Sequence, residues 1–64
     1  MSNLQVTLPD GSVQNVAAGA APIDVARSIS PRLAEDALVA KVNGDLWDLN
    51  RPFERDSSLQ ILTP

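Results

Sequence analysis

The sequence contains no cysteine and no histidine, and these two absences remove much of the common reactive chemistry. Without cysteine the chain forms neither a disulfide nor a thiolate metal site. Without histidine it lacks the commonest metal ligand and the commonest general base. Its 64 residues predict one small domain, which would bury only about 60% of its unfolded surface.

Positive charge is also scarce. Five lysines and arginines face eight acidic residues, for a net charge of −3. The five cationic residues are Arg27, Arg32, Lys41, Arg51 and Arg55, and no two are adjacent. Because phosphate backbones are bound mainly by clustered Lys and Arg, this spacing argues against a stand-alone nucleic-acid binder. A soluble acidic surface is the simpler interpretation.

Long apolar runs are missing as well. The first twenty residues hold no basic segment followed by an apolar one, so no secretory signal is predicted. No segment approaches the roughly 20 apolar residues of a membrane span. Together with the lack of cysteine, these features favour a cytoplasmic location and predict no membrane partner.

The first half of the chain predicts a hairpin. Alternating apolar and polar residues indicate a strand at about 3–8, and Pro, Asp and Gly at 9–11 indicate a turn. A second strand is expected at about 12–17. Because Val13 and Val16 are three positions apart, they cannot both face inward in a flat strand. We therefore expect either a bulge or one exposed valine.

A helix is predicted at about 22–30. Pro22 suits the first helical position, and Asp24 in the first turn is favourable to the helix dipole. The helix should end before Pro31, because the residue preceding a proline disfavours helical geometry. One further short helical turn is expected at 31–37, with Leu33 beneath the first helix. The apolar stripe of the main helix is Ile23, Val25, Ala26 and Ile29.

Three more strands are expected at about 38–43, 46–49 and 58–63. Asn-Gly at 43–44 is the strongest hairpin signal in the sequence. Phe53 is expected to be a buried anchor in the polar loop before the last strand.

This order of elements predicts an α+β fold with a single domain over residues 1–64. We expect a β-grasp (ubiquitin-like) arrangement, with a mixed four- to five-stranded sheet and one main helix packed on one face. The first and last strands should pair in parallel at the centre, because the helix provides the crossover that parallel pairing requires.

Asp45 and Asp48 are the closest approach to a catalytic or metal-binding pair. A hard cation needs about six oxygen ligands, and the neighbouring residues do not complete such a set. Hydrogen bonds to the adjacent turns are the simpler interpretation. The serines have no histidine to activate them, and the glycines are too isolated for a phosphate-binding loop. The sequence predicts no catalytic, cofactor-binding or metal-binding residue.

Trp47 is the one candidate for a binding residue. It follows Leu46 in the expected strand, so the two side chains point to opposite faces. If Leu46 faces the core, Trp47 is exposed, and an exposed tryptophan is a candidate for an interface. The alternative is a partly buried aromatic that covers the edge of the sheet.

Four segments together resemble a known family, the TGS domain, named for threonyl-tRNA synthetases, certain GTPases and the guanosine-tetraphosphate synthetase/hydrolase enzymes. Each motif alone is generic, but their order and spacing are most similar to the amino-terminal domain of bacterial threonyl-tRNA synthetases. The segments are VTLPDGSV (6–13), AGAAPIDVARSI (18–29), SPRLAEDALVAKVNGDLWDLNRP (30–52) and DSSLQILT (56–63).

The resemblance implies a non-catalytic accessory module of a threonine–tRNA ligase, an enzyme that attaches threonine to its tRNA using ATP. The ATP and zinc sites of such enzymes belong to their catalytic domain, so this chain would bind neither. Its partners would be the editing and catalytic domains of the parent chain, with a weak contact to tRNA. Ala21 departs from the family, which often has Ser or Thr there as a helix cap, at a cost of about 1 kcal/mol.

Two alternatives remain open. The chain also resembles the regulatory or ligand-binding TGS domain of a GTPase or a guanosine-tetraphosphate synthetase/hydrolase, although the latter usually lacks the PDGS opening. A ubiquitin-like sulfur carrier shares the predicted fold. Such carriers end in Gly-Gly, whereas this chain ends at Pro64, which would block their chemistry.

Overall fold

Residues 3–64 form five strands and two short helices. The computed structural model describes residues 3–64, so Met1 and Ser2 of the predicted domain lie outside the described residues. The strands are β1 (Asn3–Thr7), β2 (Val13–Ala17), β3 (Val39–Val42), β4 (Asp45–Trp47) and β5 (Ser57–Leu62). The helices are α1 (Pro22–Ile29) and α2 (Pro31–Asp36).

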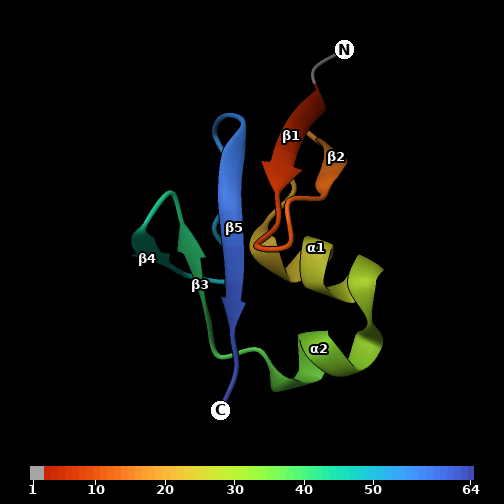
Figure 1. The fold of residues 1–64 in the computed structure, drawn as a ribbon, viewed down its shortest axis with the longest axis vertical. Coiled ribbons are helices and arrows are strands. Elements are labelled where there is room, and N and C mark those ends of the chain that lie inside the picture. Colours follow the sequence, from red (N-terminus) through yellow and green to blue (C-terminus); the bar gives the residue numbers. More distant parts are fainter. Residues whose placement is uncertain (1–2) are drawn as a thin grey trace.

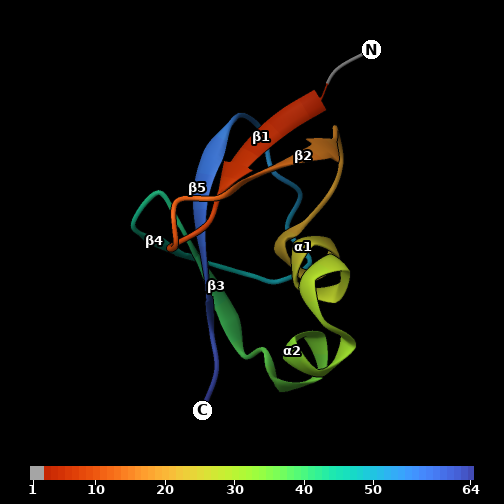
Figure 2. The ribbon, with the colours of Figure 1, turned by 45° about the vertical axis from the view of Figure 1, so that its right-hand side comes forward.

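The strands form one mixed sheet in the order β2-β1-β5-β3-β4, with both helices on one side of it (Figures 1 and 2). β1 and β5 run parallel at the centre, and the pairs β1–β2, β3–β4 and β3–β5 are antiparallel. This arrangement confirms the predicted α+β, β-grasp fold. The one clear difference in bounds is β4, which ends at Trp47 where the sequence predicted a strand over 46–49.

A tight turn at residues 8–11 sets the register of the β1–β2 hairpin. In this turn, the N–H of Gly11 donates to the carbonyl of Leu8 at 2.9 Å, and Gly11 has a φ of 90°. The β1–β2 ladder then runs without a bulge, from Thr7 opposite Val13 onward. Val13 is consequently the exposed valine of the pair predicted from the sequence, with 53% of its surface accessible.

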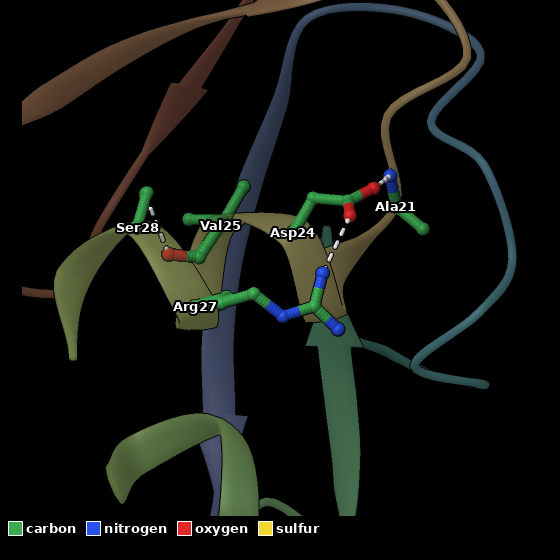
Figure 3. Close-up of polar contacts among 5 residues, drawn as sticks. All are labelled: Ala21, Asp24, Val25, Arg27 and Ser28. Carbon is green, nitrogen blue, oxygen red and sulfur yellow. Dashed lines mark hydrogen bonds and ion pairs between the residues drawn. The ribbon is translucent and has the colours of Figure 1, made fainter. Parts of the chain in front are cut away.

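The N-terminus of α1 is capped by an unusual route (Figure 3). Ala21 occupies the N-cap position and has no side-chain acceptor. Asp24 instead reaches back, and its Oδ2 accepts the Ala21 N–H at 3.0 Å while its Oδ1 lies 3.4 Å from Arg27. This is one half of a capping box. The cap side chain missing from Ala21 is thus partly replaced by a first-turn carboxylate.

Ser30 ends one helix and begins the next. Its N–H donates to the carbonyl of Ala26 at 3.0 Å, which closes α1. Its Oγ accepts the N–H of Arg32 at 3.2 Å, which caps α2. Because Pro31 cannot continue α1, Ile29 is left at the end of the helix. It is 46% exposed, although the sequence placed it on the apolar stripe.

The core lies between the sheet and α1. Phe53 is 4% exposed, as the sequence predicted for this anchor, and its N–H donates to the carbonyl of Ala20 at 2.9 Å. The N–H of Ile23 donates to the carbonyl of Leu49 at 2.9 Å, so the loop before β5 is tied to the start of α1. The buried core cluster is Val6, Val25, Ala40, Val42, Phe53 and Leu59.

Candidate functional site

Trp47 faces the core side of the sheet, and Leu46 faces solvent. In the β3–β4 ladder Trp47 lies opposite Ala40, and Leu46 lies opposite Lys41. Directly opposed residues of two strands share a face. Ala40 is fully buried and Lys41 is exposed, so Trp47 is half-buried and Leu46 is 70% exposed. The condition under which Trp47 would be exposed, with Leu46 facing the core, is therefore not met, and the half-buried Trp47 agrees with the alternative of a partly buried aromatic.

Trp47 makes three contacts within the domain. Its Nε1 donates to the carbonyl of Arg51 at 3.0 Å, and the Arg51 guanidinium carbon lies 3.9 Å from the ring centroid. The ring is tilted 39° against Phe53, with centroids 6.4 Å apart. Arg51 also approaches Glu54 at 3.5 Å. These contacts describe a partly buried aromatic at the sheet edge, and the interface role of Trp47 stays a prediction.

The two carboxylates singled out in the sequence have different surroundings. Asp48 Oδ1 accepts the N–H of Asn50 at 2.8 Å, and the Asp48 carbonyl accepts the N–H of Arg51 at 3.1 Å. Asp48 is therefore a turn residue, as predicted. Asp45 begins β4 opposite Val42. Over residues 3–64, no three acidic, histidine or cysteine side chains gather in a group able to hold a metal ion.

Asp10 is the residue with a clearly shifted acidity. Its Oδ1 accepts the Ser12 hydroxyl at 2.7 Å and the Ser12 N–H at 3.0 Å. These two hydrogen bonds stabilise the ionised form and hold the pKa of Asp10 below its usual value, the hydroxyl contributing most. The carboxylate lies fully exposed on the β1–β2 turn, and its contacts are those of a turn rather than of a catalytic group.

An apolar groove is the feature that sequence reasoning missed. It runs between the β1–β2 turn, the end of α1, α2 and β5, with a volume of about 580 Å³. At one margin, the Ser28 hydroxyl donates to the carbonyl of Val25 at 2.8 Å (Figure 3), and its oxygen lies 3.1 Å from Gln14 Oε1 on β2. The apolar lining is Leu8, Pro9, Ile29, Leu33 and Ile61. Pro31 was the available sequence signal for this groove. It ends α1 after Ile29, so Leu33 lies on a second helix and does not continue the apolar stripe of α1.

Neither α1 nor α2 could cross a bilayer, and the same holds for any helix formed by residues 3–64, since none is long and apolar enough.

Comparison with known proteins accounts for nearly the whole chain. The family model described as "TGS domain" matches residues 4–63. The threonine–tRNA ligase of Hyphomonas neptunium is 58% identical over 60 residues, which are 94% of this chain and 9% of that protein. Those of Erythrobacter litoralis and Novosphingobium aromaticivorans are 57% and 55% identical with the same coverage.

The chain thus spans about 9% of the length of these relatives. The family match and the β-grasp topology agree with each other, and together they extend from β1 to the end of β5. This chain belongs to the TGS domain family.

Proposed function

We propose that the chain is the non-catalytic, amino-terminal TGS module of a threonine–tRNA ligase that works in the cytoplasm. The observation that carries this proposal is the identity of up to 58% over 94% of the chain with proteins named threonine–tRNA ligase. In such a protein the module would be a small accessory part of an enzyme that joins threonine to tRNA.

The side chains of the module support a non-catalytic role. Zinc and ATP are the groups that a ligase of this kind needs. The donor set here does not fit zinc, and the three glycines are too isolated to form a phosphate-binding loop for ATP. The sequence has no cysteine or histidine, and the acidic residues of the described chain form no metal-binding group. Asp48 and Asp24 are committed to a turn and a helix end. We therefore assign both groups to the rest of the parent enzyme.

The ion pairs of the module support a weak contact with tRNA at most. Arg27 lies 3.4 Å from Asp24, Arg32 lies 4.0 Å from Asp36, and Arg51 lies 3.5 Å from Glu54. Three of the five cationic side chains thus have an acidic neighbour, which lowers their attraction for phosphate. The principal partner in this proposal is the remainder of the parent chain.

The complete reading frame tests this function. We expect it to continue beyond Pro64 into a long protein, and we expect that protein to charge tRNA with threonine in the presence of ATP. Charging of tRNA with [¹⁴C]threonine, compared with [¹⁴C]serine as a control, is the measurement. A product that hydrolyses GTP or forms guanosine tetraphosphate, without threonine transfer, would contradict the proposal.

A further inference from the structure

Partly exposed aliphatic side chains gather at one end of the domain. The end of α2, the segment entering β3 and the end of β5 lie near the C-terminus, and α1 lies above α2, farther from it (Figures 1 and 2). Ile29 is 46% exposed, Leu38 is 65% exposed, and the others are half-buried. We call this the C-terminal apolar surface, and it consists of Ile29, Leu33, Leu38 and Ile61. Leu62 follows Ile61 in β5 and therefore points to the opposite face of the sheet.

This surface is held by the backbone of the sheet. The N–H of Leu38 donates to the carbonyl of Leu62 at 2.9 Å, and Val39 lies opposite Leu62 in the β3–β5 ladder. Ile29, Leu33 and Ile61 line the apolar groove on the helix side. Ile29, Leu33 and Ile61 are therefore presented on helices and a strand, whereas Leu38 lies in the link between α2 and β3 and is held there by its backbone hydrogen bond to Leu62.

The other end of β5 has a different character. Arg55 and Asp56 precede the strand there, both are exposed, and Asp56 Oδ1 accepts the N–H of Gln5 at 2.8 Å. Among residues 3–64, two of the four exposed large hydrophobic residues, Ile29 and Leu38, belong to this surface, while Val13 and Leu46 lie elsewhere. An exposed apolar patch beside a groove is a candidate for a surface that a partner covers. Burying these side chains against a partner would lower the free energy, because apolar surface would be removed from water.

We propose that the C-terminal apolar surface packs against the polypeptide that follows Pro64 in the parent enzyme. The inference rests on the proposed function, which makes this chain one module of a longer protein. The last strand ends at Leu62, one residue after Ile61 and therefore next to this surface, and the relatives carry about ten times the length of the module. The polypeptide that would cover the surface therefore starts beside it.

The chemistry of the surface indicates an apolar protein partner rather than RNA. No lysine or arginine is among its four residues. Beside it on α2, the exposed Glu35 and Asp36 outnumber the exposed Arg32, which lies 4.0 Å from Asp36. Phosphate groups would be repelled there. The partner should therefore present aliphatic or aromatic side chains.

The test uses the full-length parent protein and two matched variants. Leu38→Asp places a charge on the surface, and Leu46→Asp places one on β4 at a leucine of similar exposure, 70% against 65%. Limited proteolysis between the module and the next domain reports the population in which they are apart. We expect cleavage about tenfold faster or more in Leu38→Asp, from the loss of one buried leucine contact, and unchanged in Leu46→Asp.

Equal cleavage rates in Leu38→Asp and the unsubstituted protein would overturn the inference. So would a parent protein that dimerises through this surface, shown by sedimentation in which Leu38→Asp alone dissociates the dimer. If Leu38→Asp unfolds the module, Leu38→Gln replaces it with an uncharged side chain and is expected to accelerate cleavage in the same direction.

Hydrogen exchange supplies a measurement without any substitution. We expect slower amide exchange at residues 33–38 in the full-length protein than after cleavage behind residue 64, with no difference at 45–47. Equal exchange at 33–38 would overturn the inference. A parent that shows the protection but does not charge tRNA contradicts the proposed function alone, and one that charges tRNA without the protection contradicts this inference alone.

Discussion

Asn43 and Ser58 exchange two hydrogen bonds across the sheet. The Asn43 N–H donates to the carbonyl of Ser58 at 3.1 Å, and the Ser58 N–H donates to Asn43 Oδ1 at 3.0 Å. The side-chain amide thereby acts as one more rung beyond the last β3–β5 pair, Val42 and Leu59. Asn43 also has a φ of 52°, and Gly44 follows at 89°. The same residue turns the β3–β4 hairpin and fastens it to β5.

Substitution of Asn43 separates these two roles. We expect Asn43→Ala to lower the free energy of unfolding by about 2 kcal/mol, because both the hydrogen bond and the tolerance for positive φ are lost. Asn43→Gly keeps the backbone freedom and should cost about 1 kcal/mol. Urea denaturation of the 64-residue chain measures both. Equal losses for the two variants would show that the positive φ at position 43 costs nothing, and an unchanged stability in Asn43→Gly would show that the bond to Ser58 contributes nothing.

The N-terminus of α1 offers a comparison of two contacts that share one carboxylate. Asp24→Ala removes the acceptor of the Ala21 N–H and should destabilise the chain by about 1 kcal/mol, as for a lost helix cap. Arg27→Ala removes only the ion pair, whose side chains are 64% and 51% exposed, and should cost less than about 0.5 kcal/mol. Thermal unfolding measures the difference. A larger loss for Arg27→Ala would mean that the ion pair, not the cap, dominates.

The acidity of Asp10 depends on Ser12. Ser12→Ala should raise the pKa of Asp10 by removing the hydroxyl donor, while the Ser12 N–H keeps it below its usual value. Because the folded pKa lies below the unfolded one, this contribution to stability is present at neutral pH and is lost as the pH falls below about 4. NMR titration of the Asp10 carboxyl carbon gives the pKa. An unchanged value would show that the hydroxyl bond does not form in solution.

Much of the fold follows from local patterns. Pro-Asp-Gly and Asn-Gly predicted both hairpins, and Pro22 and Pro31 marked where the helices start. The orientation of Leu46 and Trp47 was left open by the sequence because both are apolar, so alternation within the strand does not decide between them. The register of the β3–β4 hairpin decides which of the two side chains faces the core. A two-residue turn at 43–44 places Lys41 opposite Leu46. Because opposed residues share a face of the sheet, a solvent-facing Lys41 means that Leu46 also faces solvent and Trp47 faces the core.

Other features depend on contacts between distant residues. Asp56 accepts the N–H of Gln5, 51 positions away, and no local pattern predicts such a pair. The groove lined by Ile29, Leu33 and Ile61 was missed for a similar reason. Each of these residues belongs to an apolar pattern that predicts burial. The two helices are short, however, and no other element within residues 3–64 packs over the three side chains.

The isolated module should bind tRNA only weakly. We expect a Kd above roughly 100 μM at physiological salt, in the range of non-specific contacts. Glu54→Gln and Asp36→Asn release Arg51 and Arg32 from their acidic neighbours, so the double variant should bind more tightly at low salt. Filter binding with bulk tRNA is the measurement. Sub-micromolar binding by the unsubstituted chain would contradict the expectation.

The central claim is that this TGS module takes no part in the chemistry of its parent enzyme. Threonine-dependent exchange of pyrophosphate into ATP isolates the activation step from tRNA binding. We predict that the parent protein without residues 1–64 exchanges pyrophosphate within about tenfold of the full protein, a difference of under 1.4 kcal/mol in barrier height, and that the isolated module shows none. Exchange by the module itself, or its complete loss in a folded parent that lacks the module, would contradict the claim.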